Sequence, residues 1–284
     1  MAEIGGIEAA LHLVAVPIGA ARDITLRALD LLAGADVLAA EDTRSLRRLM
    51  EIHGIPLGDR PLLAYHDHNG AAVRPKLLAV LREGKSVAYA SEAGTPLVAD
   101  PGFQLGVAAR AEGLTVRAAP GASAVLAALC VAGLPTDRFL FAGFLPPKSG
   151  ARKAALRELA AVPATLVLYE SPKRLVALLR DAAEVLGARE AAVCRELTKR
   201  FEEVRRGTLD ALSAAYGDEA PRGEIVVVID RAAARDADPE ALRDALRAAL
   251  AEGSVKSAAQ EISDAFGVPR RQVYEMALAM KDET

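Results

Sequence analysis

The sequence lacks several residue types that mark common protein classes. Its 284 residues include two cysteines, no tryptophan and only 4% aromatic residues. Cys130 and Cys194 are far apart and no CxxC pair occurs, which excludes a disulfide scaffold. Both lie in apolar runs, where buried and unreactive thiols are expected. Since apolar residues still make up 52% of the chain, the core must be built mainly from aliphatic side chains.

Strong charge and long apolar runs are also missing. A net charge of −3 argues against a protein that coats nucleic acid over its whole surface, although local basic patches are compatible with it. No apolar stretch reaches the roughly 18 residues that a membrane helix needs. The acidic start, MAEIGGIEAA, lacks the basic region of a signal peptide. We therefore expect a cytoplasmic protein that makes no membrane contact.

The usual ligand-binding motifs do not occur either. No GxGxxG follows the first predicted strand, and LREGKS resembles the end of a P-loop whose first glycine is replaced by Ala79. Dinucleotide and ATP sites are therefore disfavoured. No HExxH occurs; HDH, with His66 and His68, could suggest a metal, but a polar loop is the simpler interpretation. We expect a polar loop there and no metal site.

Strand-like runs alternate with helical patterns along most of the chain. In the first half, amphipathic helical patterns separate runs at 11–16, 36–40, 86–90 and 115–119. This alternation predicts a parallel α/β sheet. The second half has runs with fewer helices between them, at 139–144, 165–170, 191–197 and 223–230. A mixed sheet is expected there.

The composition changes near residue 238. DPEALRDALRAALAEG begins with Asp238 as a predicted N-cap and proline at the first helical position. The remainder predicts a helix, a turn at 267–269 and another helix, as in a helix-turn-helix. We expect an α/β domain at 1–119, a second α/β domain at 120–231 and a helical tail domain at 238–284.

Polar side chains gather where the predicted strands end. Ligands of open α/β sheets bind beyond the carboxyl ends of the strands. In SEAGTPLVADPG, glycines let the backbone approach a ligand, and Pro96 and Pro101 stiffen the loop. A turn alone does not need the acid, Glu92. Similar clusters near Glu41, Ser123 and Glu170 favour a functional cleft over ordinary polar loops.

Several motifs, taken in order, resemble one known family. They include VPIGAARDITLRAL, AAEDTR, YHDHN, SEAGTPLVADPG, PGASAVLAAL, LYESPKR, RELTK and GEIVVVI. From about Leu11 to Leu278 the chain resembles the tetrapyrrole-methylase-like superfamily of S-adenosylmethionine (SAM) methyltransferases. EDTR, YESPKR and RELTK are typical of the subfamily that methylates the ribose 2′-oxygen of a cytidine in the decoding region of 16S rRNA.

The resemblance implies a fold, a cofactor and partners. It implies two α/β domains of the tetrapyrrole methylase fold with SAM bent in the cleft between them, a helical C-terminal domain, a homodimer and the small ribosomal subunit as substrate. The cofactor pocket that it implies comprises Pro17, Ser91, Glu92, Gly94, Thr95, Ser123, Ala124, Ala142 and Tyr169. Glu92 departs from the family's usual Asp by one methylene, which puts its contact with the cofactor in question.

The chemistry points to a carboxylate base. A ribose 2′-hydroxyl is a weak nucleophile until its proton is withdrawn, and histidine is scarce in this chain. Glu170 is the first candidate, followed by Glu41 and Glu196. The alternative for each is a structural ion pair with a nearby arginine, such as Arg44, Arg174 or Arg195.

Basic residues near the strand ends are the expected RNA contacts, because RNA binding needs cations against phosphates. The principal candidates are Arg44, Lys148, Lys173, Arg174, Arg195 and Lys199. Neighbouring basic residues extend these clusters, among them Arg47, Arg48, Arg152, Lys153, Arg200, Arg205 and Arg206. Tyr65, Phe144 and Tyr169 are the aromatics available to stack on a base.

Two other functions fit parts of the sequence. One is another SAM methyltransferase of the same fold, acting on a tetrapyrrole or a modified amino acid, which would not call for the basic clusters or the tail. The other is a ligand-sensing helix-turn-helix DNA-binding regulator. That function needs a more basic recognition helix than RRQVYEMAL provides.

Overall fold

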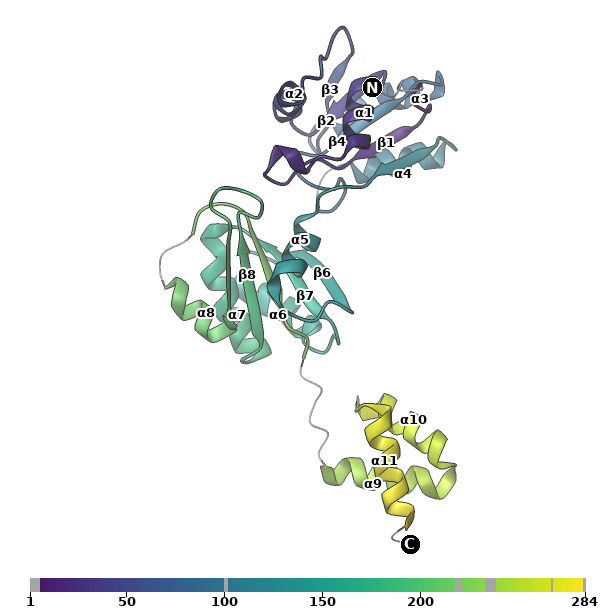
Figure 1. Ribbon diagram of the computed structural model, residues 1–284, viewed down its shortest axis with the longest axis vertical. Helices are drawn as coiled ribbons and strands as arrows, with labels where there is room; N and C mark the ends of the chain where they lie inside the picture. Colours follow the sequence, from purple (N-terminus) through teal and green to yellow (C-terminus); the bar gives the residue numbers. More distant parts are fainter. Residues whose placement is uncertain (1–5, 100–101, 218–220, 233–238, 267, 283–284) are drawn as a thin grey trace. The chain divides into compact units, whose positions relative to one another are not determined.

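The protein is described here by a computed structural model, which covers residues 6–99, 102–217, 221–232, 239–266 and 268–282. The chain divides into two compact units, Met1–Leu159 with Thr165–Asp230, and Ala160–Ala164 with Arg231–Thr284. The first unit holds two β-sheets and the second is helical (Figure 1). Pro101, Asp238 and Gly267, which the sequence analysis used, lie outside the described residues.

The first sheet is parallel throughout, as predicted. Its strand order is β3-β2-β4-β1-β5, and β1 pairs on one side with β4 and on the other with β5. The strands are β1 (Leu11–Val14), β2 (Val37–Ala40), β3 (Leu62–Ala64), β4 (Val87–Ala90) and β5 (Val116–Ala119). The sequence analysis missed β3, because three half-exposed residues are too few to show alternation.

Helices connect these strands and bury them on both faces. They are η1 (Ala21–Asp23), α1 (Leu26–Gly34), α2 (Thr43–Ile52), α3 (Gly70–Arg82) and α4 (Phe103–Ala111). One aliphatic cluster packs α1 and α2 against the sheet, and another packs α3 and α4. Side-chain caps fix where α1 and α2 begin: Thr25 accepts from the N–H of Ala28, and Asp42 from that of Arg44. Loops therefore follow the carboxyl ends of β1, β2 and β4.

The second sheet is mixed, as predicted. Its order is β6-β7-β10-β8-β9; β6 and β7 are parallel and the other pairs antiparallel. The strands are β6 (Phe139–Phe144), β7 (Thr165–Glu170), β8 (Glu190–Arg195), β9 (Glu203–Thr208) and β10 (Ile225–Ile229). The sequence analysis missed β9, because this edge strand reads EVRRGT and shows no apolar run.

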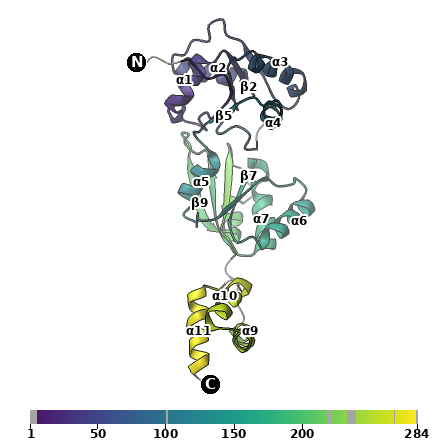
Figure 2. The ribbon, with the colours of Figure 1, turned by 90° about the vertical axis from the view of Figure 1, so that its right-hand side faces the viewer.

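The helices of this half lie on the two faces of the second sheet (Figure 2). They are α5 (Ala124–Ala132), α6 (Ser149–Ala160), η2 (Pro172–Arg174), α7 (Leu175–Leu186) and α8 (Leu209–Tyr216). On one face, α5 packs Val125 and Leu129 against Val167 and Val226. Tyr169 belongs to the same cluster, so it points to the α5 side of the sheet.

The C-terminal unit is a three-helix bundle. Its helices are α9 (Pro239–Glu252), α10 (Val255–Phe266) and α11 (Arg270–Asp282). Leu246, Ala259, Val273 and Ala277 form its buried centre. The two predicted helices on either side of residues 267–269 are present as α10 and α11. None of the helices within the described ranges is long and apolar enough to cross a membrane.

Candidate active site

Backbone hydrogen bonds tie together the loops that follow β1 and β4. Val16 and Gly94 exchange two bonds, with N···O distances of 2.9 and 3.0 Å. Gly94 has φ +70°, and a Cβ there would lie 3.2 Å from Cγ2 of Ile18. Glycine is therefore needed for both conformation and space. The joined loops form one main-chain wall, which we call the Val16–Gly94 wall.

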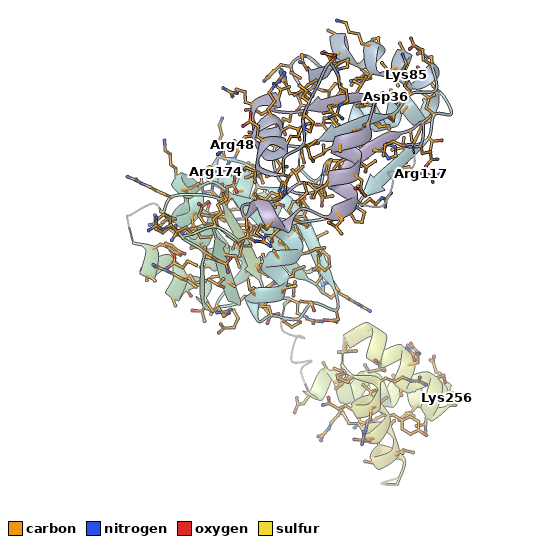
Figure 3. All side chains as sticks on the ribbon, turned by 45° about the horizontal axis from the view of Figure 1, so that its top comes forward. Asp36, Arg48, Lys85, Arg117, Arg174 and Lys256 are labelled. Carbon is orange, nitrogen blue, oxygen red and sulfur yellow. The ribbon has the colours of Figure 1, made fainter. Side chains whose placement is uncertain are left out.

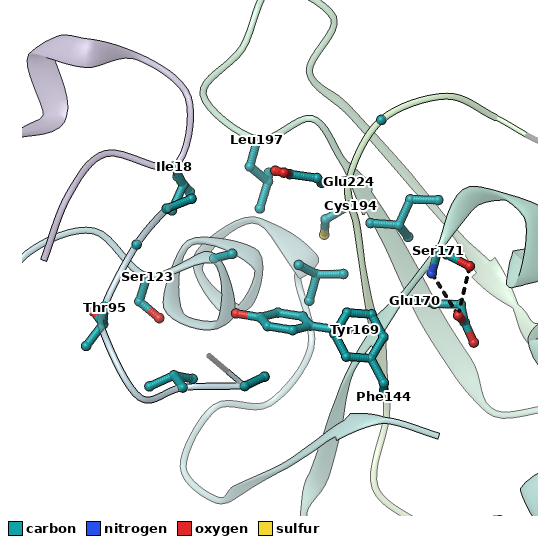
Figure 4. Close-up of a pocket in the computed structure, with 18 of the residues that line it drawn as sticks. Ile18, Thr95, Ser123, Phe144, Tyr169, Glu170, Ser171, Cys194, Leu197 and Glu224 are labelled. Carbon is teal, nitrogen blue, oxygen red and sulfur yellow. Dashed lines mark hydrogen bonds between the residues drawn. The ribbon is translucent and has the colours of Figure 1, made fainter. Parts of the chain in front are cut away.

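A cavity of about 380 Å³, the central cavity, lies on one side of this wall (Figure 4). The joined loops and the start of α5 line part of it, with Ile18, Ala93, Gly94, Thr95, Val98, Ala99, Ser123 and Ala124. The second sheet lines the rest with Phe144, Tyr169, Glu170, Ser171, Pro172, Cys194, Leu197, Gly223, Glu224, Ile225 and Val226. Its volume falls in the range of cofactor sites.

One end of the central cavity is polar and is formed by Thr95, Ser123 and the start of α5. Thr95 donates its hydroxyl proton to the carbonyl of Ala122 at 2.9 Å, which holds the loop against the start of α5. Ser123 makes no side-chain cap to α5, and the helix begins at the cavity with Ala124. The N–H groups of a first helical turn lack intrahelical partners and attract anions. This end of the cavity suits a carboxylate or another anionic group.

Aromatic rings form the opposite end. The ring of Tyr169 lies 4.8 Å from that of Phe141 and 5.6 Å from that of Phe144, both edge to face. Figure 4 shows the Tyr169 ring crossing the cavity toward Ser123. Phe144 is 57% exposed and stands at the rim. These rings offer a flat apolar ligand a surface to stack on. Burial raises the pKa of the Cys194 thiol to about 11, so the thiol is neutral and unreactive near pH 7.

Glu170 follows Tyr169 in β7, and its carboxylate points away from the Tyr169 ring (Figure 4). Its side chain is fully buried; Oε1 accepts from the N–H of Ser171 at 2.7 Å and lies 3.1 Å from Nε of Arg174. Oε2 has no hydrogen-bond partner among the described residues. The first candidate for the base thus belongs to the cavity lining, but its carboxylate is held in an ion pair with Arg174.

The turn after β8 holds the third candidate acid, Glu196. Its carboxylate accepts from the N–H of Glu224 at 2.9 Å and from Nζ of Lys199 at 3.0 Å. The bond from Glu224 is the main cause that lowers the pKa of Glu196. A Cβ on Gly223 would lie 2.4 Å from the Glu196 side chain, so glycine makes room for this contact. This geometry is that of a structural clamp.

A second cavity of about 570 Å³, the Arg44 cavity, lies on the other side of the Val16–Gly94 wall. Its lining includes Pro17, Arg44, Arg48, Ser91 and Glu92. The structure thus separates the expected cofactor residues. Gly94, Thr95, Ser123, Ala124 and Tyr169 line the central cavity, whereas Pro17, Ser91 and Glu92 line the Arg44 cavity.

Ala142 lines neither cavity. It sits at the bulge of β6, where the register with β7 shifts between Phe141 and Gly143. Phe144, two residues further on, reaches the central cavity instead. The sequence analysis also missed the cavity residues of β8, β10 and their flanking turns, such as Leu197 and Ile225. The RELTK and GEIVVVI motifs contain these residues and were the available signal.

Glu41, at the end of β2, has a different environment from the other two acids. Its Oε2 accepts from the N–H of Glu92 at 3.4 Å, and no cation of the described chain lies within ion-pair distance. Burial, opposed by the bond from Glu92 and reinforced by the charges of Glu92 and Asp67, raises the pKa of Glu41. A half-buried carboxylate with a raised pKa is suited to accept a proton.

The basic residues fall into two groups. Arg44 is 90% exposed in its side chain but binds both oxygens of Asp42, which holds the pKa of Asp42 at about 2. Of the other principal candidates, Arg174 pairs with Glu170, Arg195 with Glu203, and Lys199 with Glu196 and Glu224. Lys148 and Lys173 are exposed and form no ion pair within the described ranges.

The expectation that Arg152 contacts RNA is wrong. Arg152 is only 3% exposed and pairs with Asp181 at 2.6 Å, beneath the surface between α6 and α7. By contrast, Arg48 and Lys256, labelled in Figure 3, are not buried. The ring centroids of His66 and His68 are 5.9 Å apart, and the rings meet edge to face. No group of three or more potential metal ligands occurs in the described part of the chain.

Comparisons with known proteins show which families this chain is similar to. The family model of Tetrapyrrole (Corrin/Porphyrin) Methylases matches residues 10–213, and that of the RsmI C-terminal HTH domain matches residues 236–281. The chain is 49% identical over 278 residues to ribosomal RNA small subunit methyltransferase I of Mesorhizobium japonicum, covering 97% of this chain and 94% of that protein. It is 44% identical to the protein of the same name from Micromonospora olivasterospora, covering 93% and 85%.

A solved structure shares the fold. The uroporphyrin-III C-methyltransferase of Thermus thermophilus, complexed with S-adenosylhomocysteine, superposes with a TM-score of 0.54 at 22% identity, covering 77% of this chain and 96% of that chain. This likeness establishes the fold of the α/β unit, and the sequence relatives extend over both units. The chain belongs to the tetrapyrrole (corrin/porphyrin) methylase family and, within it, to the ribosomal RNA small subunit methyltransferase I family.

Proposed function

We propose that this protein is a SAM-dependent methyltransferase of small-subunit rRNA, and that it methylates the ribose 2′-oxygen of a cytidine in the decoding region of 16S rRNA. The observation that carries the proposal is the central cavity at the strand ends of a chain that belongs to this family. The proposal includes a cytoplasmic location and a homodimeric enzyme.

The central cavity fits SAM in size and chemistry. The rings of Tyr169 and Phe144 suit an adenine, and the first turn of α5 suits the carboxylate of the methionine moiety. Thr95 and Ser123 add hydroxyl groups between these ends. SAM supplies a methyl group made electrophilic by a sulfonium. The chain's contribution is to hold it in a mainly apolar cavity that restricts water.

The Arg44 cavity is the proposed acceptor side. The loops after β1 and β4 border both cavities, so RNA bound in the Arg44 cavity is held beside the cofactor cavity. The 2′-oxygen itself must enter the central cavity, because it has to meet the methyl carbon directly as the C–S bond breaks. Arg44 and Arg48 line it, and both are exposed enough to meet phosphates. Pro17, Ser91 and Glu92 are then assigned to the acceptor side, where they line the Arg44 cavity.

Of the three candidate acids, Glu41 has the environment best suited to a general base; it lines neither cavity but contacts Glu92 of the Arg44 cavity. Glu170 and Glu196 are held in ion pairs with Arg174 and Lys199, whereas Glu41 is half-buried, unpaired with any described cation and raised in pKa. As the 2′-oxygen attacks the methyl carbon, the carboxylate of Glu41 takes up the proton of the 2′-hydroxyl. We assign Glu170 to positioning the 170–174 turn beside the cavity.

A tetrapyrrole or a modified amino acid is the second candidate substrate, because the fold is shared with enzymes named for tetrapyrrole methylation. The match of residues 236–281 to a helix-turn-helix domain of the rRNA enzymes favours RNA.

The test is methylation with radiolabelled SAM. Purified protein is incubated with small ribosomal subunits that lack the modification, with naked 16S rRNA and with uroporphyrinogen III, and the labelled nucleoside is identified by mass spectrometry. The expected product is a 2′-O-methylcytidine in small-subunit rRNA. Label in the tetrapyrrole alone, or at a base atom of the RNA, contradicts the proposal.

A further inference from the structure

The loop that joins β8 to β9, residues 196–202, ends in an exposed aromatic residue. Phe201 is 63% exposed, and the guanidinium carbon of Arg200 lies 5.4 Å from the centre of its ring. We propose that this loop is an RNA-binding element in which Phe201 stacks on an unpaired base and Arg200 binds a neighbouring phosphate. The inference rests on the proposed rRNA substrate; it adds Phe201 to its recognition and gives Arg200 a specific role beside it.

The loop is held in one conformation. Glu196 and Thr198 have φ of +50° and +65°, a region that residues other than glycine rarely adopt and keep only where the surroundings hold them. The Thr198 hydroxyl oxygen accepts from the N–H of Ala20 at 3.1 Å, and the Thr198 N–H donates to the Glu202 carboxylate at 2.5 Å. A binding element fixed before it meets its ligand loses less entropy on binding.

The loop also starts at the central cavity. Leu197 lines that cavity, and Lys199 packs against Gly19 of the loop after β1. Four residues of chain span at most about 14 Å, so Phe201 lies within that distance of the cavity lining. A base stacked on Phe201 therefore belongs to a nucleotide close in space to the one that is methylated.

Charge distinguishes Arg200 from the other cations of this hairpin. Arg195 and Arg205 both pair with Glu203, Lys199 pairs with Glu196 and Glu224, and Arg206 donates to backbone carbonyls of α5. Arg200 has no acid within ion-pair distance in the described ranges, and its guanidinium group lies over the Phe201 ring. It is therefore available to a phosphate.

The chemistry of Phe201 selects an unpaired base. A phenylalanine ring offers no hydrogen-bond group, so it reads no sequence, but every base has a flat face on which it can stack. Bases inside a duplex are already stacked on both sides, whereas unstacked bases of loops and single strands are free to meet an aromatic ring. The partner is therefore a single-stranded segment of the RNA.

The experiment compares Phe201→Ala, Phe201→Tyr and Phe201→Leu in the full-length protein. The matched control is Phe139→Ala, an exposed aromatic at the opposite end of β6 from the cavity residue Phe144. KM and kcat are measured for small subunits and for naked 16S rRNA, SAM affinity by calorimetry, and oligomeric state by sedimentation. Phe201→Ala is expected to raise KM for RNA about five- to tenfold or more, with kcat at saturating RNA and SAM affinity retained.

The other variants make stacking falsifiable. Phe201→Tyr is expected to retain the wild-type KM, Phe201→Leu to behave like Phe201→Ala, and Phe139→Ala to have no effect. An unchanged KM for Phe201→Ala, or full activity of Phe201→Leu, overturns the inference. A loss confined to assembled subunits indicates a protein contact, and a changed sedimentation coefficient indicates a dimer contact; each also overturns it. If the wild-type protein methylates no rRNA at all, the proposed function itself has failed.

Discussion

Ala20 and Thr198, which are 178 residues apart in the chain, are joined by a hydrogen bond of 3.1 Å from the Ala20 N–H to the Thr198 hydroxyl oxygen. Next to it, a Cβ on Gly19 would lie 2.5 Å from Cγ of Lys199 and 3.1 Å from the carbonyl oxygen of Leu197. The loops after β1 and β8 therefore meet at a position where only glycine fits.

Gly19→Ala is predicted to impair catalysis more than stability. The added methyl group must displace Thr198 and Lys199, which shifts loops that line both cavities. A misplacement of about 1 Å costs up to about 100-fold in rate, so we expect kcat/KM to fall about 10- to 100-fold. The control is Gly150→Ala, where a Cβ would meet nothing within 4 Å. Equal activity of the two variants contradicts this packing.

Glu41→Gln is predicted to lower kcat by about 10²- to 10⁴-fold, the usual contribution of a general base. In the wild type, activity should fall on the acid side of the raised pKa of Glu41, because only the carboxylate accepts a proton. The pH–rate profile checks this, and the variant should lose that acid limb. The comparison is Glu170→Gln, which breaks a buried ion pair and is expected to reduce stability. Full turnover by Glu41→Gln removes it from the base role.

Relative to the wild type, Glu41→Gln is expected to gain stability as the pH rises, whereas Asp36→Asn is expected to lose it. Burial raises the pKa of Glu41 above 4.5, so its ionised form destabilises the fold. Glu41→Gln should therefore be more stable than wild type at pH 7, and the gain should vanish below pH 4.5.

Asp36 binds the hydroxyl and the N–H of Ser86 at 2.6 and 2.8 Å, and the hydroxyl bond is the main cause that lowers its pKa below 3.8. Asp36→Asn should be less stable at pH 7, with the loss shrinking as the pH falls through the lowered pKa. Asp36 lies near Lys85 at the amino ends of β2 and β4, away from the strand ends that line the cavities (Figure 3). Urea unfolding across pH measures both variants, and like-signed pH dependence contradicts the prediction.

Arg152→Ala is predicted to destabilise the α/β unit by about 1.5–3 kcal/mol, because it removes the closest partner of the buried Asp181 carboxylate and leaves Lys153 at 3.7 Å and the hydroxyl of Ser149. Chemical unfolding measures the loss. The exposed pair of Arg82 and Glu112 is the control, and Arg82→Ala should change stability little. If Arg152→Ala instead leaves stability unchanged and weakens RNA binding, the arginine is not the structural residue that its burial indicates.

Lys148→Ala and Lys173→Ala are predicted to weaken RNA binding through phosphates. Each lost phosphate contact should reduce the slope of log Kd against log salt by about 0.7 for a single strand. Fluorescence anisotropy with a 16S rRNA fragment at several salt concentrations provides the slopes. Arg117→Ala, which removes a surface pair with Glu8, should leave the slope unchanged. A loss of affinity with an unaltered slope would mean that the lysines do not meet phosphates.

The sequence predicted the elements with clear periodicity and missed those without it. The buried runs of β1, β4 and β10 were identified because apolar residues fill them, whereas β3 is short and β9 is an edge strand rich in arginine. Motifs located the cavity loops, but alternation in β7 does not reveal which face carries Tyr169 and which Glu170. The sequence also does not reveal that Arg152 forms an ion pair with Asp181, because that pairing depends on how α6 and α7 pack.

The wall between the two cavities consists of main chain, and this affects how the family can diverge. Every residue keeps its carbonyl group and every residue except proline keeps its amide N–H, so most mutations cannot remove these groups and can only bend or crowd them. Replacements such as Glu92 for the aspartate usual in the family are then tolerated, whereas any side chain at Gly94 is not. Sequence changes in this segment should therefore preserve the backbone conformation while the side chains vary. Methyl-donor binding should persist in relatives whose loops share few side chains.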